Sequence, residues 1–223
     1  MSAVLDNPIW ASLTGAHAYL AQRQGRAARY PDDVAPFTAL SHEGDERAWA
    51  DLAVLAGSGA TVWVPGSGAH PPSWQEVRTI AGVQLEGTAV AGAADAEAVR
   101  LGARDVPEMM DLVARTDPGP FRSRTVELGT YLGIRRGGVL VAMAGQRLRP
   151  PGWTEVSTVC TDESVRGQGL ATRLIRAVVA EIRSRGDLPF LHAAHDNHSA
   201  IRLYESLGFS LRRHTAFMMV QVP

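Results

Sequence analysis

Two glycines, Gly167 and Gly169, lie in a short loop between a predicted strand and a predicted helix. The strand covers residues 155–161, which are rich in β-branched side chains and contain neither Gly nor Pro. The helix begins near Leu170, because apolar residues recur after it at spacings of three and four. Such a loop presents unpaired backbone N–H groups at the positive end of a helix dipole. The chemistry that this arrangement favours is the binding of a phosphate or a pyrophosphate.

Two common phosphate-binding motifs do not fit this loop. The P-loop requires a lysine directly after its last glycine, and none stands there. The dinucleotide fingerprint requires a third glycine at the position of Thr172. The pattern that does fit is [RQ]-x-x-G-x-[GA], written here as Arg166-Gly-Gln-Gly-Leu-Ala171. It resembles the pyrophosphate-binding motif of the GNAT superfamily, the acyl-CoA-dependent N-acyltransferases.

A second motif follows about 25 residues after the loop. It reads Asn197-His-Ser-Ala-Ile-Arg-Leu-Tyr204-Glu-Ser-Leu-Gly-Phe209 and is similar to the second GNAT signature, N-x-x-A-x-x-L-Y-x-x-x-G-F. The order and separation of the two motifs match that superfamily. The resemblance covers about residues 95–221. Within the superfamily, this half of the chain most resembles the glycine N-acyltransferase-like group.

The resemblance implies where a cofactor would bind. In the family, the strand before the loop splays away from the next strand, and the pantetheine arm of the cofactor lies in the opening. The co-substrate is then acetyl-CoA or another acyl-CoA, and no metal is needed. The residues that the resemblance places at the cofactor are Val159, Cys160, Thr161, Arg166, Gly167, Gln168, Gly169, Leu170, Ala171, Thr172 and Asn197.

Two residues are candidates for acid–base chemistry. Tyr204 shares an apolar helix face with Leu203 and Leu207, so the pattern alone favours a core tyrosine. The resemblance instead implies that the Tyr204 hydroxyl protonates the departing CoA thiolate. Glu155, at the start of the strand, is the candidate base for the amine; a solvated carboxylate is the alternative.

Three histidines and the single cysteine attract less specific interpretations. His192, His195 and His198 span a strand, a turn and a helix start, so they would not share one face, and we expect no metal site. We expect His192 or His195 to line the acceptor pocket instead. Cys160 lies in mid-strand without a neighbouring base in the sequence. Because the family transfers the acyl group directly to the acceptor, we do not expect Cys160 to act as a nucleophile.

The elements that position these residues follow the order βαβββαβαβ, which is that of the GNAT fold. Strand patterns cover residues 99–101, 131–134, 139–144, 155–161, 190–193 and 209–222, with helices over 105–116, 170–185 and 197–207 between them. Asp105 and Glu108 predict a capping box, and Gly137-Gly138 predicts a tight hairpin turn. The fold class is therefore α/β with a mixed sheet.

The first part of the chain carries no recognisable motif. Asn7-Pro8 predicts the start of a helix whose apolar face runs to Leu20, and further patterns predict a helix over 45–56 and strands over 60–64 and 79–85. An Ala/Gly-rich stretch over 88–95 suggests two domains, 1–93 and 94–223. The order of elements in 1–93 is compatible with a reduced copy of the same fold.

Composition narrows the functional classes. A net charge of −1 and a pI of about 6.7 give no reason to expect nucleic acid or an anionic membrane as a partner. One cysteine and no signal-peptide pattern at the start predict a cytoplasmic protein. We expect an N-acetyltransferase that acetylates a primary amine of a small molecule or amino acid by direct attack. The alternatives are a non-catalytic acyl-CoA-binding module and an acetyltransferase for protein lysines or N-termini. Because dimers are common in the superfamily, homodimerisation stays open.

Overall fold

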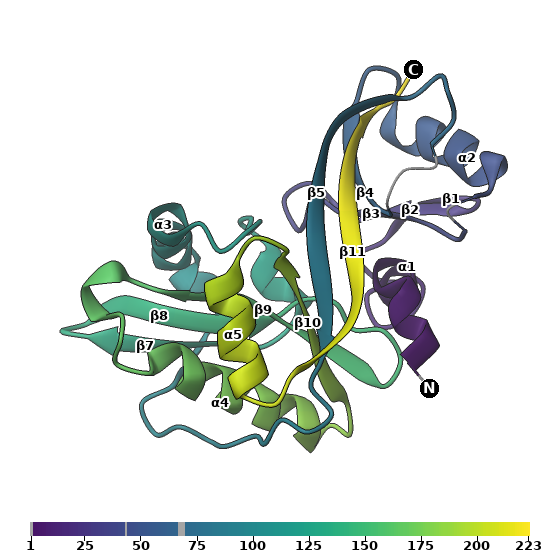
Figure 1. Cartoon of the computed structure of the whole chain (residues 1–223). Helices are drawn as coiled ribbons and strands as arrows, with labels where there is room; N and C mark the ends of the chain where they lie inside the picture. Colours follow the sequence, from purple (N-terminus) through teal and green to yellow (C-terminus); the bar gives the residue numbers. More distant parts are fainter. Residues whose placement is uncertain (1, 43, 67–69) are drawn as a thin grey trace.

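The computed structural model describes residues 2–42, 44–66 and 70–223, and its centre is an eight-stranded mixed sheet (Figure 1). The strands lie in the order β4-β11-β5-β10-β9-β8-β7-β6. Their bounds are Thr61–Pro65 for β4, Gln75–Glu86 for β5, Val99–Leu101 for β6, Tyr131–Arg136 for β7, Val139–Gln146 for β8, Trp153–Thr161 for β9, Leu188–Ala194 for β10 and Ser210–Gln221 for β11. The pair β9–β10 is parallel and the other neighbouring pairs are antiparallel.

From β6 onward the chain follows the predicted order βαβββαβαβ. Its helices are α3 (Val106–Thr116), α4 (Leu170–Ser184) and α5 (His198–Ser206). Met143 packs with α3, whereas Ala142 and Ala144 pack with the core under α4 and α5. Because neighbouring residues of a strand point to opposite faces, α3 covers one face of the sheet and α4 the other. The predicted mixed α/β fold is confirmed.

Local chemistry explains most of the helix and turn boundaries. Gly137 and Gly138 turn the β7–β8 hairpin with φ values of 56° and 86°, as predicted. The predicted capping box at α3 is wrong: the Asp105 side chain accepts a hydrogen bond from the Gly102 N–H group at 2.9 Å, and Glu108 pairs with Arg135. Asp105 pairs with the same arginine at 2.7 Å. Both carboxylates are therefore engaged away from the helix start.

The first helix is shorter than its apolar pattern predicts. Helix α1 covers Pro8–Leu13, with Asn7 as its cap and Pro8 at its first position. The Thr14 hydroxyl donates to the Trp10 carbonyl at 2.8 Å, and Gly15 follows at once. A side chain that competes for backbone groups and a glycine both disfavour continuation of a helix. The stretch up to Leu20 is therefore made of turns.

The N-terminal region builds a small sheet and also completes the large one. Strands β1 (Gln22–Gln24), β2 (Ala27–Arg29) and β3 (Thr38–Leu40) form a three-stranded antiparallel sheet, and α2 (Glu46–Ala56) packs on it. Strand β5 lies between β10 and β11, and the long β5–β11 pair runs from the central sheet to the lobe with α2 (Figure 1). The sheet therefore continues across the proposed boundary near residue 93, and that boundary stays a prediction.

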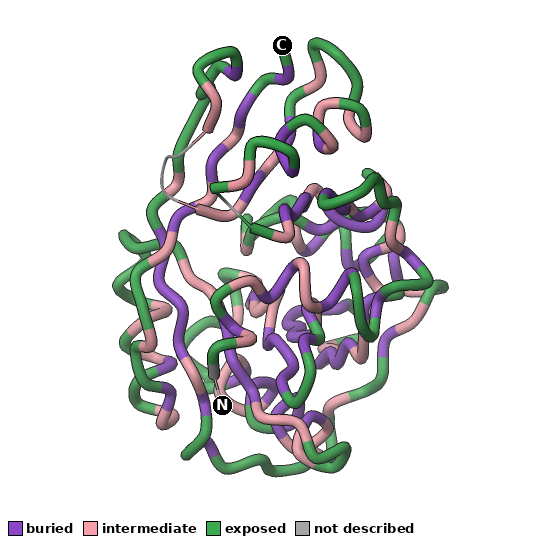
Figure 2. The backbone as a smooth tube through the Cα atoms, turned by 90° about the vertical axis from the view of Figure 1, so that its right-hand side faces the viewer, coloured by how far each residue is buried: buried purple, intermediate pink, exposed green. Residues whose placement is uncertain are grey.

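Several buried clusters hold these layers together. The largest packs α4 and α5 on the central strands, and another joins the N-terminal segment to Trp153 and Phe190. Figure 2 shows buried positions gathered inside the molecule and exposed positions on the outer turns. The N-terminal segment is thus part of the same packed body as the sheet.

Within that segment, His17 should make stability depend on pH. Its side chain is 2% exposed, and its Nδ1 atom lies 2.9 Å from the Tyr30 hydroxyl. Burial lowers the pKa of His17 from 6.5 to about 4. In the unfolded chain His17 takes up a proton below pH 6.5, while the folded protein resists protonation down to about pH 4. Stability is therefore fully present above pH 6.5 and falls as the pH drops towards 4, by up to ~3 kcal/mol.

Urea unfolding of the protein and of His17→Asn at pH 7.5 and pH 4.5 checks this expectation. The variant keeps a polar atom near the Nδ1 position but cannot gain the charge. We expect it to lose less stability than the unaltered protein between the two pH values. Equal losses would show that other groups carry the acid sensitivity.

Candidate active site

An opening between β9 and β10 is the central feature of the site. The two strands pair only from Trp153–Glu155 to Leu188–Phe190. Beyond that point β10 continues along β5 and β9 continues along β8. Among the described strands, none pairs with the edge of β9 that faces β10 over residues 156–161. A ligand that runs along this edge can form backbone hydrogen bonds as an added strand would.

A distortion of β9 lies inside this opening. The pairing with β8 shifts register between Met143 and Gly145, and Thr158, on the facing strand, has a φ of +52°. A β-branched residue in the left-handed region is strained, and such strain clusters at functional sites. A bulge also turns the following backbone groups away from the ladder. The distortion therefore supports the opening as a binding site for backbone-recognised ligands.

The glycine loop forms one end of the opening. Gly167 and Gly169 have φ values of +78° and +74°, and an added Cβ at either position would meet open space. Gly169 is the N-terminal cap of α4, and among the described residues no side chain caps this helix. Its first N–H groups consequently have no partner within the helix. An anion with several oxygens fits this arrangement, because the loop supplies donors, a helix dipole and free space.

The opening and the loop enclose a cavity of about 510 Å³, which is in the usual range for small-molecule sites. It gathers most of the residues predicted to hold the cofactor: Val159, Cys160, Thr161, Arg166, Gly167, Gly169, Leu170, Ala171, Thr172 and Asn197. Tyr204 lines it too, whereas Gln168 and Glu155 do not. The Thr161 hydroxyl is buried without a hydrogen-bond partner in the described structure, so a bound ligand could use it.

A further wall of this cavity lies outside the two motifs. Residues Thr116, Asp117 and Pro118, at the end of α3, line it as well. Asp117 ends the helix with a φ of 44°, and Arg115 pairs with Asp162 at the start of the glycine loop. The Asp-Pro-Gly-Pro run over 117–120 marks the helix end in the sequence, but nothing in it indicates a contact with the loop.

Tyr204 lies on α5 and is 9% exposed, with its ring 5.9 Å from that of Phe209. Burial raises the pKa of Tyr204 to about 12, so the hydroxyl is protonated at neutral pH. Burial likewise raises the pKa of Cys160 to about 11, so its thiol does not ionise to a nucleophile at neutral pH. The cavity therefore holds one buried proton donor of suitable chemistry and no thiolate.

Glu155 lies behind the opening, in a buried polar network. Its carboxylate is fully buried and accepts hydrogen bonds from Arg147 at 2.7 and 2.8 Å and from the His192 Nδ1–H group at 2.7 Å. Burial by itself would raise the pKa of Glu155, but the Arg147 guanidinium outweighs it and holds the pKa well below its usual range. The carboxylate is thus charged and is held by Arg147, by His192 and, at 3.3 Å, by the Leu148 N–H group.

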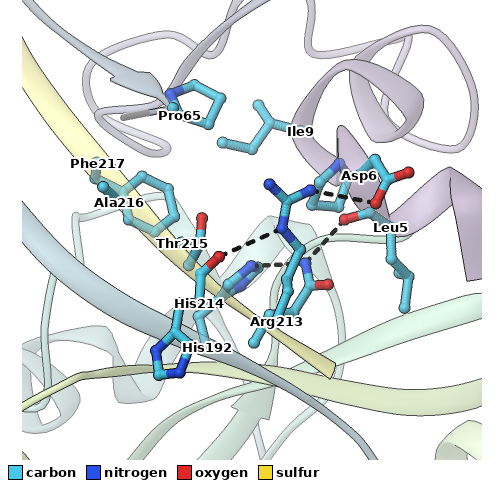
Figure 3. Close-up of a pocket in the computed structure, with 13 residues that line it drawn as sticks. Leu5, Asp6, Ile9, Pro65, His192, Arg213, His214, Thr215, Ala216 and Phe217 are labelled. Carbon is cyan, nitrogen blue, oxygen red and sulfur yellow. Dashed lines mark hydrogen bonds and ion pairs between the residues drawn. The ribbon is translucent and has the colours of Figure 1, made fainter. Parts of the chain in front are cut away.

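His192 connects this network to a second cavity of about 200 Å³ on the far side of β10 from α4 (Figure 3). Its Nε2 atom accepts a hydrogen bond from the Gln84 amide at 3.0 Å, and the same amide donates to the Leu5 carbonyl at 2.9 Å. The cavity is walled by the N-terminal segment on one side and by β11 on the other, where Arg213 extends towards Asp6.

His195, His198 and the helices add no further site within the part of the chain that the structure describes. His195 and His198 are exposed, and their rings lie 6.4 Å apart. Within residues 2–42, 44–66 and 70–223, no group of three or more His, Cys, Asp or Glu side chains is arranged to hold a metal ion. In the same part of the chain, no helix is both long and apolar enough to span a bilayer.

Comparison with known proteins identifies the family. Residues 131–218 match the family model described as FR47-like protein. The chain is 36% identical over 130 residues to an N-alpha-acetyltransferase RimI of Mycobacterium tuberculosis, covering 52% of this chain and 81% of that one. It is 40% identical to a solved GNAT-family protein of Novosphingobium aromaticivorans, with a TM-score of 0.89 and 98% of each chain covered.

A solved GCN5-related N-acetyltransferase of Kribbella flavida has a similar fold over almost the whole chain, and at its low identity the similarity concerns the fold alone. It has a TM-score of 0.64 at 16% identity, and the match covers 97% of this chain and 95% of that one. The N-terminal segment and the central sheet are thus matched together in whole-length relatives. With the opening, the glycine loop and Tyr204 in place, the chain belongs to the GNAT family and is an acyl-CoA-dependent N-acetyltransferase.

Proposed function

We propose that this protein transfers an acetyl group from acetyl-CoA to the primary amine of a small molecule, by direct attack in a ternary complex. The observation that carries the proposal is the opening between β9 and β10, which ends at an uncapped helix start and has Tyr204 on its wall. These features supply, in order, a path for an extended chain, a pyrophosphate site and a proton donor.

Binding of acetyl-CoA would use the backbone more than side chains. The free edge at Val159, Cys160 and Thr161 would pair with the amide groups of the pantetheine arm. The N–H groups of residues 167–172 would hold the pyrophosphate, with Arg166 at the start of the loop. Charge-assisted hydrogen bonds contribute ~1.5–3 kcal/mol each, so several of them account for useful affinity. Asn197 caps α5 by accepting from the Ala200 N–H group at 3.1 Å and lies at the same cavity.

Catalysis would depend on Tyr204 as general acid. When the amine attacks the thioester, the C–N bond forms, the C–S bond breaks, and the departing thiolate takes the Tyr204 proton. The attacking nitrogen then releases its extra proton, through water, to the Tyr204 phenolate, which restores the hydroxyl. A backbone N–H group near the bulge of β9 would polarise the thioester carbonyl. Since Glu155 lines neither cavity and already holds Arg147 and His192, we propose a structural role for it in place of contact with the amine.

A small acceptor fits the second cavity better than a protein surface does. About 200 Å³ between the N-terminal segment and β11 holds a small group, not a folded partner. The second candidate is a terminal α-amine of a protein, favoured by the similarity to an N-alpha-acetyltransferase. Four expectations stay predictions. They are membership of the glycine N-acyltransferase-like group, the domain boundary at residue 93, homodimerisation and a cytoplasmic location.

Replacing Gly169 with Glu should abolish binding of acetyl-CoA, because the new carboxylate would occupy the anion site at the start of α4. Gly186→Glu is a matched control: Gly186 follows the other end of α4, its φ is +80°, and it also has open space around it. Isothermal titration with acetyl-CoA should show micromolar binding for the unaltered protein and the control only. If all three proteins bind equally, or none binds, the proposed cofactor site is wrong.

A further inference from the structure

The charges around the second cavity are not balanced. Arg212 donates to the Asp6 carboxylate at 2.6 Å and to the Gln84 side-chain oxygen at 2.7 Å. Arg213 donates to the same Asp6 oxygen at 3.2 Å. Two guanidinium groups therefore share one carboxylate. The nearby Glu155 does not correct the excess, because its charge is already paired with Arg147.

The two arginines differ in how firmly they are held. The Arg212 side chain is 14% exposed and has two partners at short distances, so it acts as a fixed brace. Arg213 is 46% exposed, and its hydrogen bonds are long: 3.2 Å to Asp6 and 3.4 Å from Nε to the His214 carbonyl. Figure 3 shows its guanidinium lying within the cavity. Of the two arginines, Arg213 can therefore leave Asp6 and bind an incoming anion more easily.

Strand β10 borders both the second cavity and the opening in which the acetyl group would lie. One edge of β10 pairs with β5 from Phe190 to Ala194, so its other edge faces the opening beyond Phe190. The backbone of His192 is part of that free edge, and its side chain lines the second cavity. A molecule anchored in this cavity therefore lies across one strand from the opening.

From this geometry we propose that the acceptor amine also carries a carboxylate, and that this carboxylate binds Arg213 in place of Asp6. In the absence of acceptor, the Asp6 carboxylate occupies the position beside Arg213. When the acceptor carboxylate takes this position, Asp6 stays bound to Arg212. A guanidinium binds a carboxylate through two parallel hydrogen bonds, which also fixes the orientation of the ligand. This inference rests on the proposed function and specifies its substrate class.

Variants on the two sides of the ion pair separate this idea from a purely structural bridge. Removing the competing carboxylate with Asp6→Asn should lower KM for a carboxylate-bearing acceptor. Removing the guanidinium with Arg213→Gln should raise KM for the same acceptor by about tenfold or more, because one charge-assisted interaction is lost. A structural bridge would respond in the same direction to both changes, because each one weakens the same contact between β11 and the N-terminal segment.

The experiment measures CoA release from acetyl-CoA with a panel of free amino acids and with the C-terminal amides of the same amino acids. The unaltered protein should prefer acids over amides by about tenfold or more in kcat/KM. Arg213→Gln should lose this preference and Asp6→Asn should strengthen it. Arg78→Gln, at an exposed site at the far end of β5, should behave as the unaltered protein. Unchanged affinity for acetyl-CoA in every variant confirms that each one is folded.

The possible failures are distinct. Equal use of acids and amides by the unaltered protein would overturn the carboxylate site and leave the acetyltransferase proposal intact. A loss of acid turnover in both Asp6→Asn and Arg213→Gln would overturn it as well, in favour of a structural bridge. If no amine is acetylated and acetyl-CoA does not bind, the proposed function itself fails and this inference falls with it.

Discussion

Tyr204→Phe should lower kcat by about 10²-fold or more, with little change in affinity for acetyl-CoA. The substitution removes only the hydroxyl, so the departing thiolate loses its proton donor, and general acid help of this kind contributes about 10²–10⁴ in rate. The ring and its contact with Phe209 remain, so the fold of α5 should be preserved. Steady-state kinetics with titration of acetyl-CoA separates the effect on kcat from the effect on binding.

Tyr19→Phe is the matched control for this prediction. The Tyr19 side chain is exposed and donates to the Glu127 carbonyl at 3.1 Å, away from both cavities. Its variant should retain full kcat. A Tyr204→Phe enzyme with unaltered kcat would show that Tyr204 is only a core residue, which is the reading that its helical pattern favours on its own.

Arg147→Met should destabilise the protein by about 3–5 kcal/mol. The change leaves the Glu155 carboxylate fully buried with its main countercharge removed, and an uncompensated buried charge has a cost of that order. Arg124→Met offers a comparison on the surface, because Arg124 pairs with Asp33 and Glu127 while 42% exposed. An exposed pair contributes about 0–1 kcal/mol. Urea unfolding at neutral pH measures both differences.

The double variant Arg147→Met with Glu155→Met tests the reason for the loss. Replacing both members of a buried ion pair with apolar side chains is often close to neutral, so the double variant should recover most of the stability. A double variant less stable than Arg147→Met would contradict this account of Glu155. It would show that the carboxylate stabilises the protein chiefly through His192, or through another contact.

Local patterns predicted the elements that carry the cofactor site. The glycine loop, the start of α4 and the Asn197 cap depend on neighbouring residues, so the sequence contains enough information for them. The hairpin at Gly137 and Gly138 is of the same kind. The resemblance to the GNAT superfamily then related two motifs that are far apart in sequence, and the described cavity brings both of them together.

Features that depend on distant segments were not predicted. No period in the sequence indicates that β5 lies between β10 and β11, because strand pairing over more than 100 residues leaves no local pattern. Glu155 has the residue type and strand position of an exposed carboxylate, and only the folded structure places Arg147 and His192 on it. The second cavity joins the N-terminal segment to β11, and its detailed geometry likewise depends on contacts between distant segments.

Hydrogen exchange of the backbone, measured with and without acetyl-CoA, tests the central claim most directly. The N–H groups of residues 167–172 and the free edge of β9 at 157–161 should be slowed by acetyl-CoA, because both would donate to the bound molecule. Residues 46–56 of α2, which line neither cavity, should exchange at the same rate in both samples. Slowing at 157–161 and 167–172 would support the proposed site. Unchanged exchange there, with acetyl-CoA bound elsewhere or not at all, would contradict it.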